Sequence, residues 1–328
     1  MLGMKKLTWI GVLILAIGAL ASLVGCGQSQ AYPNKQIEFV VHTDPGDAVY
    51  IFADNAARIL TSQKIVPQPI NVVTKSGGSS AAAYSYVNGK KGDHYYLLTC
   101  QPSAITTPIN QGLDITWKNF TPIASMIADE NVVSVKSDSP YKSIKDLVEK
   151  AKKSPKSVNV GGTTFGAADS IVLHLIEKNG GCEFNYVAFK SAGESVVALL
   201  GGNVDAISCN PSEVIGQVQA GTVRVLAVAS EKRSPFLPNV PTMKEEGLNF
   251  TFNSFRGVVA PGGISADVAK YWETAFTKLK DEQAWKDSLK ANNTIEFYMN
   301  SADFKAYLEE QEKFYRQTLD EMGLLKKK

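Results

Sequence analysis

The alternation of short apolar runs with amphipathic stretches constrains the fold of this chain most strongly. From residue 37 the pattern predicts strands at 37–41, 70–73 and 95–99, separated by helices at 47–62 and 79–88. The apolar residues of the first helix recur at the 3.6-residue period of a buried helix face. Short strands joined through helices form parallel sheets that are covered on both faces. The opening of the chain therefore predicts an α/β fold.

A second series of the same kind begins near Val132. It predicts strands at 132–135, 158–161, 184–187, 204–208, 223–228 and 255–260, and helices at 143–153, 168–179, 195–200, 213–220, 265–280, 284–291 and 302–322. Ser143 and Asp146 are spaced as a capping box at a helix start. No long flexible linker separates the two series. We therefore predict two lobes, each a mainly parallel sheet flanked by helices, with residues 37–130 plus 254–328 in lobe 1 and residues 131–253 in lobe 2.

The N-terminal sequence is typical of a targeting segment. Lys5 and Lys6 precede an uncharged apolar run at 7–24, and Cys26 follows small residues in a pattern that resembles a lipobox. We predict a lipoprotein signal peptide at 1–25, a lipidated Cys26 and a linker at 26–36. The alternative is an uncleaved anchor, because about 18 apolar residues approach membrane-spanning length. Either way, the bulk of the chain is expected outside the cytoplasm and tethered to the membrane, at the cell surface or in a periplasm.

Charge and cysteine content exclude several classes of function. The 34 Lys and Arg, two of them in the targeting segment, balance 32 Asp and Glu, so the chain has no basic field for nucleic acid. Cys100, Cys182 and Cys209 match no zinc spacing. Buried free thiols are expected, with a Cys100–Cys209 disulfide as the alternative. We expect no metal, no cofactor and a monomer.

Two strand-to-helix junctions have the chemistry of an anion site. They lie at 41–48 and 161–170, and both combine glycine, alanine and threonine. Small residues allow a ligand to approach the backbone, and the N–H groups of a first helical turn favour a carboxylate. An ordinary tight turn would have the same composition. Two such junctions in separate lobes nevertheless indicate a ligand cleft between the lobes.

Several ordered motifs resemble one family. They are YPNKQI at 32–37, LLGGNVDA at 199–206, AGTVRVLAV at 220–228, LPNVPTMKEEG at 237–247 and RGVVAP at 256–261. Together they resemble the tripartite tricarboxylate transporter receptors, also called the Bug solute-binding proteins. The resemblance implies a type II periplasmic-binding-protein fold that closes on di- or tricarboxylates, aromatic acids or amino acids. It also implies a membrane permease with one large and one small subunit as the partner.

The resemblance assigns the ligand carboxylate to two loops. Their backbone amides and bridging waters would hold it, and the site residues would be Thr43, Pro45, Gly46, Asp47 and Ala48 in the first loop and Thr163, Thr164, Phe165, Gly166, Ala167 and Asp169 in the second. The family's first loop is usually a run of glycines after the proline, whereas this chain has Asp47. That side chain either caps the helix or faces the cleft. Like charges ~4 Å apart repel by about 4 kcal/mol at a dielectric near 20, so we hypothesise a monocarboxylate, or an acid with a donor group, over citrate.

Two further polar residues are candidates for ligand contacts. Arg256 follows a predicted crossover and could bind a carboxylate through its guanidinium fork, or else form a salt bridge to an acid such as Asp205. Asn210 follows a strand and could donate to the ligand, or else cap the helix after it.

The sequence does not predict an enzyme. It has His42, His94 and His174 but no Gly-x-Ser-x-Gly, His-Glu-x-x-His or Walker A motif. His174 lies in a predicted helix beside Ile171 and Leu175, where a satisfied core residue is expected. A hydrolase that uses His42 is a remote alternative. A ligand-loaded partner of a membrane sensor kinase is another, because its binding chemistry would be the same.

Overall fold

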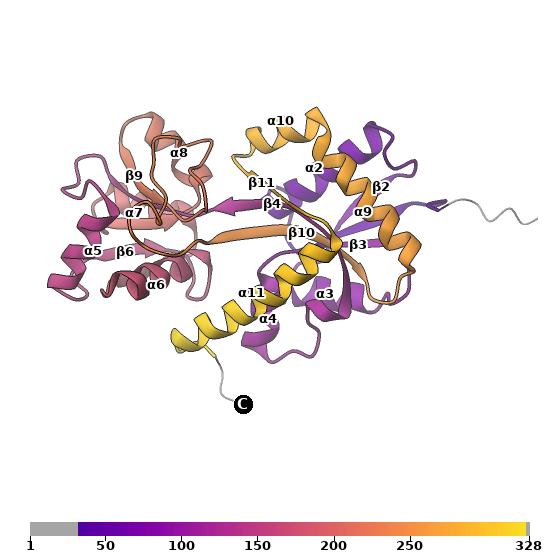
Figure 1. Cartoon of the computed structure of the whole chain (residues 1–328), viewed down its shortest axis with the longest axis horizontal. Coiled ribbons are helices and arrows are strands. Elements are labelled where there is room, and N and C mark those ends of the chain that lie inside the picture. Colours follow the sequence, from indigo (N-terminus) through magenta and orange to yellow (C-terminus); the bar gives the residue numbers. More distant parts are fainter. Residues whose placement is uncertain (1–31, 326–328) are drawn as a thin grey trace, which may run out of the picture. The chain divides into compact units, whose positions relative to one another are not determined.

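The computed structural model describes residues 32–325 and consists of two sheets flanked by helices (Figure 1). Of the described residues, 35–325 belong to one compact unit, which contains all the described helices and strands. The predicted signal peptide and Cys26 lie outside the described residues. Between residues 32 and 325, no helix has the length and apolar character needed to cross a membrane.

The first sheet has six strands. In spatial order they are β11 (Ile295–Met299), β4 (Phe120–Glu130), β10 (Asn253–Pro261), β3 (Tyr96–Cys100), β1 (Ile37–Val41) and β2 (Ile70–Thr74). The helical segments of this lobe are α2 (Ala48–Ser62), η1 (Gly78–Ser80), α3 (Ala81–Asn88), α4 (Ser103–Gln111), η2 (Trp117–Asn119), α9 (Ala266–Asp281), α10 (Gln283–Ala291) and α11 (Ser301–Glu321).

The second sheet has five strands. In spatial order they are β7 (Asn185–Ala188), β6 (Asn159–Gly162), β8 (Ala206–Cys209), β5 (Val132–Lys136) and β9 (Val223–Val228). Its helices are α5 (Ile144–Lys153), α6 (Ala168–Gly180), α7 (Ala192–Leu200) and α8 (Pro211–Gln219).

The α/β class is confirmed, but both sheets are mixed rather than mainly parallel. β2, β1 and β3 run parallel, and so do β7, β6 and β8. The remaining pairs are antiparallel. The reason is that β4 and β10 form a long antiparallel pair, from Asn253 opposite Glu130 to Pro261 opposite Phe120, along which the chain runs between the two sheets (Figure 1).

One α-helix and two strands were not predicted from the sequence. α4 contains Pro108 and several β-branched residues, which weaken the helix pattern. β4 is buried on both faces for most of its length, so apolar and polar residues do not alternate along it. β11 is a short edge strand that follows a helix closely.

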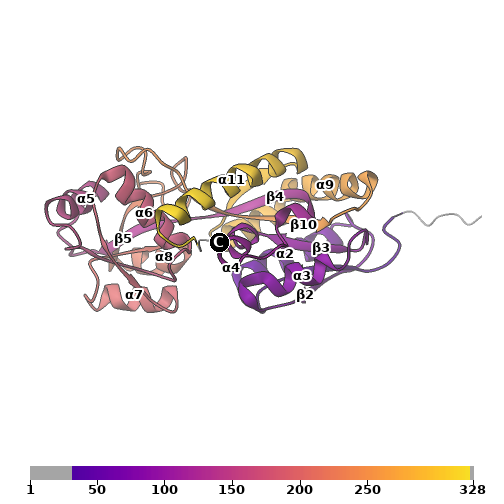
Figure 2. The ribbon, with the colours of Figure 1, turned by 90° about the horizontal axis from the view of Figure 1, so that it is seen from below.

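The last helix, α11, connects the two lobes. Near its start, the rings of Phe304 and Tyr307 pack against Phe255 of β10 at centroid distances of 5.8 and 5.4 Å. Near its end, Glu321 accepts hydrogen bonds from Lys178 and pairs with His174, both on α6. Figure 2 shows α11 running from the first lobe to the second. His174 is thus part of a link between the lobes, at 20% side-chain exposure, rather than the core residue expected from the sequence.

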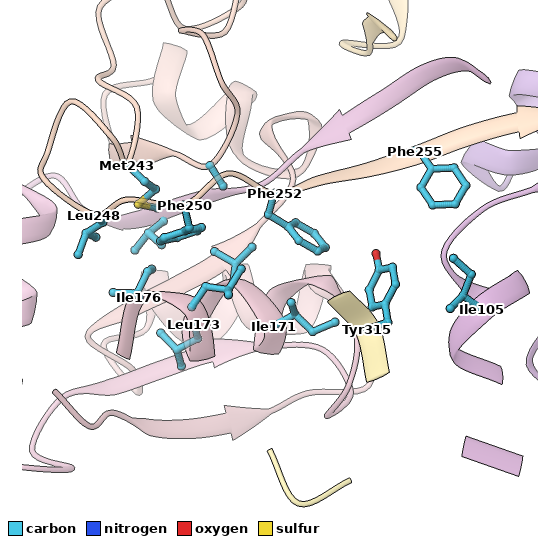
Figure 3. Close-up of a cluster of buried hydrophobic side chains, with 14 of the residues drawn as sticks. Ile105, Ile171, Leu173, Ile176, Met243, Leu248, Phe250, Phe252, Phe255 and Tyr315 are labelled. Carbon is cyan, nitrogen blue, oxygen red and sulfur yellow. The ribbon is translucent and has the colours of Figure 1, made fainter. Parts of the chain in front are cut away.

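Side chains from both lobes form one apolar cluster. Figure 3 shows Tyr315 of α11 between Ile171 of α6 and Ile105 of α4, with Phe252 nearby. Phe252 also contacts Phe314 of α11 at a centroid distance of 6.3 Å. The apolar core is therefore continuous from the first sheet to α6. Cys100, Cys182 and Cys209 are buried free thiols.

Close packing of α11 on β10 requires glycine at position 257. A Cβ atom there would lie 2.5 Å from Phe304 Cζ and 2.6 Å from the Ala124 carbonyl oxygen. We expect Gly257→Ala to lower the free energy of unfolding by about 1–3 kcal/mol, because the ring and the backbone must both move. Urea unfolding measures this change.

The matched control is Gly216→Ala in α8, where a Cβ atom would meet nothing within 4 Å. That variant should keep its stability or gain up to about 1 kcal/mol from the higher helix propensity of alanine. Equal effects of the two substitutions would contradict the packing argument.

Candidate functional site

The first candidate loop connects β1 to α2. Asp47 is the N-cap of α2, and its Oδ1 accepts a hydrogen bond of 2.8 Å from the Val49 N–H. The Asp47 N–H donates to the Asp44 carbonyl oxygen at 3.1 Å, and Gly46 has a φ of +96°. The loop is therefore a tight turn that needs glycine at 46 and an acceptor at 47. Of the two interpretations of Asp47, helix capping is the one observed.

The second candidate loop connects β6 to α6 and is held by Asp169. The Thr163 N–H and Oγ1 donate to Asp169 Oδ2 at 2.9 and 2.7 Å, and Asn131 Nδ2 donates to Oδ1 at 3.3 Å. Burial raises the pKa of Asp169, which is 5% exposed. The Tyr186 hydroxyl donates to the Thr163 carbonyl oxygen at 2.8 Å. Asp169 thus fixes the shape of the loop from inside lobe 2.

Both loops present backbone N–H groups that donate no hydrogen bond within the described part of the chain. They include those of Gly46 and Ala48 in the first loop and those of Phe165 and Ala168 in the second. Ala48 and Ala168 each directly follow the N-cap residue of a helix, where such groups have no intrahelical partner. This is the arrangement that binds anions at helix N-termini.

The first loop borders a cavity of about 290 Å³ between the lobes. Gly46 and Ala48 line it, together with Asn210 and Glu213 from lobe 2 and Arg256 from β10. Asp129, Phe52 and residues of α10 also line it.

The second loop borders a separate cavity of about 380 Å³. Residues 164–168 line it from lobe 2, and Gln101, Ser103 and Thr107 line it from lobe 1. Tyr315 of α11 closes one side. The structure thus places the two loops in different cavities, with Thr43, Pro45, Asp47, Thr163 and Asp169 outside both linings.

His42, immediately after β1, contacts Gln101, which lines the second cavity. His42 Nε2 lies 2.7 Å from Gln101 Nε2, so the neutral ring accepts there. Burial lowers the pKa of His42 from 6.5 to about 4, Asp47 opposes the shift and Arg256 adds to it. Sequence reasoning considered His42 only for catalysis and missed Gln101. The position of Gln101, immediately after β3, could have identified it by the rule that ligands bind beyond strand ends.

Arg256 forms an ion pair within lobe 1. Its Nη2 contacts Asp129 Oδ2, and its Nη1 donates to the Ala48 carbonyl oxygen at 3.1 Å. Its partner is therefore Asp129 rather than Asp205, which accepts a 2.8 Å hydrogen bond from the Asn159 N–H. The pair holds the first turn of α2 against β10.

Asn210 and Glu213 contribute to the lobe 2 wall of the first cavity. Asn210 is the N-cap of α8, and its N–H donates to Glu213 Oε2 at 2.8 Å. Burial, with Asp169 and Asp129 adding to it, raises the pKa of Glu213 to about 7. Among residues 32–325, no group of three His, Cys, Asp or Glu side chains is placed to hold a metal ion.

Comparison with known proteins identifies relatives of this chain. Residues 54–324 match the model of the family described as "Tripartite tricarboxylate transporter family receptor". A Cupriavidus necator protein named "UPF0065 protein in gbd 5'region" is 28% identical over 319 residues, which cover 94% of this chain and 93% of that protein.

Solved structures share the fold. A TctC solute-binding protein from Polaromonas, crystallised without ligand, has a TM-score of 0.80 and 27% identity, and the alignment covers 88% of this chain and 99% of that one. A protein from R. palustris, solved with adipate, shares the fold with a TM-score of 0.70 at 23% identity, covering 89% and 98% of the two chains. The predicted family and the two-lobed binding-protein fold are thereby confirmed.

The low pKa of His42 predicts a pH-dependent stability. Because the folded-state pKa of about 4 lies below the unfolded value of 6.5, the folded state favours the neutral ring. The contribution is fully present above pH 6.5 and is lost as the pH falls towards 4. When the pH is lowered from 7 to 4.5, the free energy of unfolding should fall in the unmodified chain. We expect this fall to be about 2 kcal/mol smaller in His42→Gln.

Urea unfolding at the two pH values measures this difference. His94→Gln, which changes a histidine outside both cavity linings, is the control. If His42→Gln lost as much stability on acidification as the unmodified chain, His42 would not be the responsible group.

Proposed function

Because this chain belongs to the tripartite tricarboxylate transporter receptor family, we propose that it captures a small carboxylate between its lobes outside the cytoplasm and delivers it to a membrane permease. The observation that carries the proposal is the pair of loops with unpartnered N–H groups at helix starts, one in each lobe. The lobes would comprise residues 37–130 plus 254–328 and residues 131–253. Cys26 would carry the lipid anchor, and the permease would have one large and one small subunit.

The ligand carboxylate would bind between the two loops as the lobes close. The N–H groups of Gly46 and Ala48 would donate from one side, and those of Phe165 and Ala168 from the other. Thr43 and Thr164 belong to the same two loops, so their hydroxyls could donate further hydrogen bonds to the carboxylate. Thr43 Oγ1 is buried and has no partner among the described residues, which supports a role for it. Both helix dipoles would favour the negative charge.

The charges around the cavities favour a ligand with one carboxylate. Among the described residues that line them, Arg256 is the only cationic side chain, and Asp129 already neutralises it. Glu213 lines the same cavity as the Asp129–Arg256 pair, so a second or third carboxylate on the ligand would find no free cation there and would be repelled by Glu213 when that group is ionised. An amine or hydroxyl on the ligand would instead find acceptors. We therefore propose a monocarboxylate, or an acid with a donor group, over citrate.

Calorimetric titration tests this proposal. A broad panel of monocarboxylates, including acetate, lactate and benzoate, is compared with succinate and citrate at pH 7. We expect at least one monocarboxylate to bind about tenfold or more tightly than citrate, because the extra carboxylates of citrate would lose water without gaining a free cation in either cavity. At a ligand concentration ~100 times its dissociation constant, the unfolding free energy should rise by about 2.7 kcal/mol.

The possible outcomes separate the two parts of the proposal. Tighter binding of citrate would contradict the monocarboxylate assignment and leave the receptor function in place. Failure of every acid in the panel to bind or to raise the unfolding temperature would contradict the carboxylate receptor itself.

A further inference from the structure

The second ligand loop is contacted by a helix that begins in the other lobe. A Cβ atom at Gly166 would lie 3.4 Å from Leu324 Cδ1 and 3.6 Å from Leu319 Cδ2. Leu319 is the last fully buried residue of α11, and Leu324 follows the end of that helix. The C-terminal end of α11 thus covers Gly166, in the middle of the loop whose residues 164–168 line the second cavity.

The same end of α11 is bonded to the helix that follows the loop. Glu321 accepts hydrogen bonds of 2.7 and 2.9 Å from Lys178 Nζ, and His174 Nε2 lies 3.2 Å from its Oε2. Hydrogen bonds from Lys178, from Gln317 and from His174 lower the pKa of Glu321 to about 2, so the group stays charged at neutral pH. Both α6 partners lie on the helix that begins at Ala168.

The start of α11 is fixed in lobe 1. Ser301 Oγ donates to the Pro122 carbonyl oxygen at 2.7 Å, and Phe304 packs on Gly257 and Phe255. Midway along the helix, Glu312 bonds Trp117 Nε1 at 3.0 Å and Lys118 Nζ at 2.8 Å. A single helix of 21 residues therefore joins the first sheet to the ligand loop of the second lobe.

We propose that the C-terminal end of α11, through Leu319, Glu321 and Leu324, is a positioning strap that holds the second ligand loop in its binding shape. The strap acts on the N–H groups at 165–168 through Gly166 and α6, without contacting the ligand. The expected effect of the strap on ligand affinity rests on the proposed receptor function. Its effect on the loop itself does not, and can be measured without any ligand.

Hydrogen exchange of the ligand-free full chain tests the strap. The reporters are the Gly166 and Ala167 amides, which donate to Ser170 Oγ at 2.8 Å and to the Thr164 carbonyl oxygen at 3.0 Å. We expect Glu321→Gln to speed exchange in a peptide covering 163–170 by about three- to tenfold, because local opening becomes easier. Leu324→Ala, which removes the apolar contact at a half-buried position, should have the same effect.

Glu312→Gln is the matched control. It removes the same charge from the same helix and also breaks ion pairs, but its partners are Trp117 and Lys118 of lobe 1 and Arg316 of α11 itself, none of which belongs to α6. We expect exchange at 163–170 to stay unchanged in this variant, whatever happens to its global stability. Unchanged exchange at 163–170 in both Glu321→Gln and Leu324→Ala, or the same increase in Glu312→Gln, would overturn the proposal.

The effect on binding provides a second readout. For an acid that binds the unmodified chain, Glu321→Gln should weaken affinity severalfold and Glu312→Gln should not. Failure of the receptor function would appear as absence of binding to the unmodified chain, whereas failure of the strap would appear as equal affinities and equal exchange in the two variants.

Discussion

The hydrogen-bonding requirement of helix N-termini is the constraint on which the rest of this structure depends. The first N–H groups of a helix have no partner within it, and α2 and α6 both start at a turn with such groups on residues that line a cavity. In each case a carboxylate next to the turn is already used for structure. Asp47 caps α2, and Asp169 binds Thr163 behind the second turn. The remaining N–H groups are therefore available to an external acceptor.

Electrostatics around these turns narrows the choice of that acceptor. Arg256 forms an ion pair with Asp129 and donates a hydrogen bond to the Ala48 carbonyl oxygen. Its charge therefore stabilises the start of α2 and does not add a free cation to the cavity. Burial raises the pKa of both Asp129 and Glu213, although Arg256 opposes the shift of Asp129. Backbone dipoles rather than side-chain cations would then carry most of the attraction for an anion, which suits a ligand of low charge.

The sequence predicted the features that depend on interactions between residues close together in the chain. The capping box of Ser143 and Asp146, and the cap at Asp47, which was one of the two interpretations of that residue, follow from residues three or fewer positions apart. The glycine and alanine turns were found for the same reason. What the sequence did not reveal depends on distant partners. The ion pair of Arg256 joins residues 127 positions apart, and the bond between His174 and Glu321 joins residues 147 apart. The role of α11 at the second loop could not be read from its amphipathic pattern, which indicates only that one face is buried.

Removing one N–H group at each turn tests the central claim most directly. Ala48 and Ala168 are the first residues of α2 and α6, where proline is tolerated, and the residues before them already have extended backbone, with ψ angles of 149° and 170°. Ala48→Pro and Ala168→Pro should each weaken carboxylate binding at least tenfold in a calorimetric titration, because a hydrogen bond to a charged group contributes about 1.5–3 kcal/mol. Ala266→Pro, at the start of α9 and outside both cavities, should leave affinity unchanged. Unaltered affinity in both loop variants, with folding intact, would show that the carboxylate is held elsewhere.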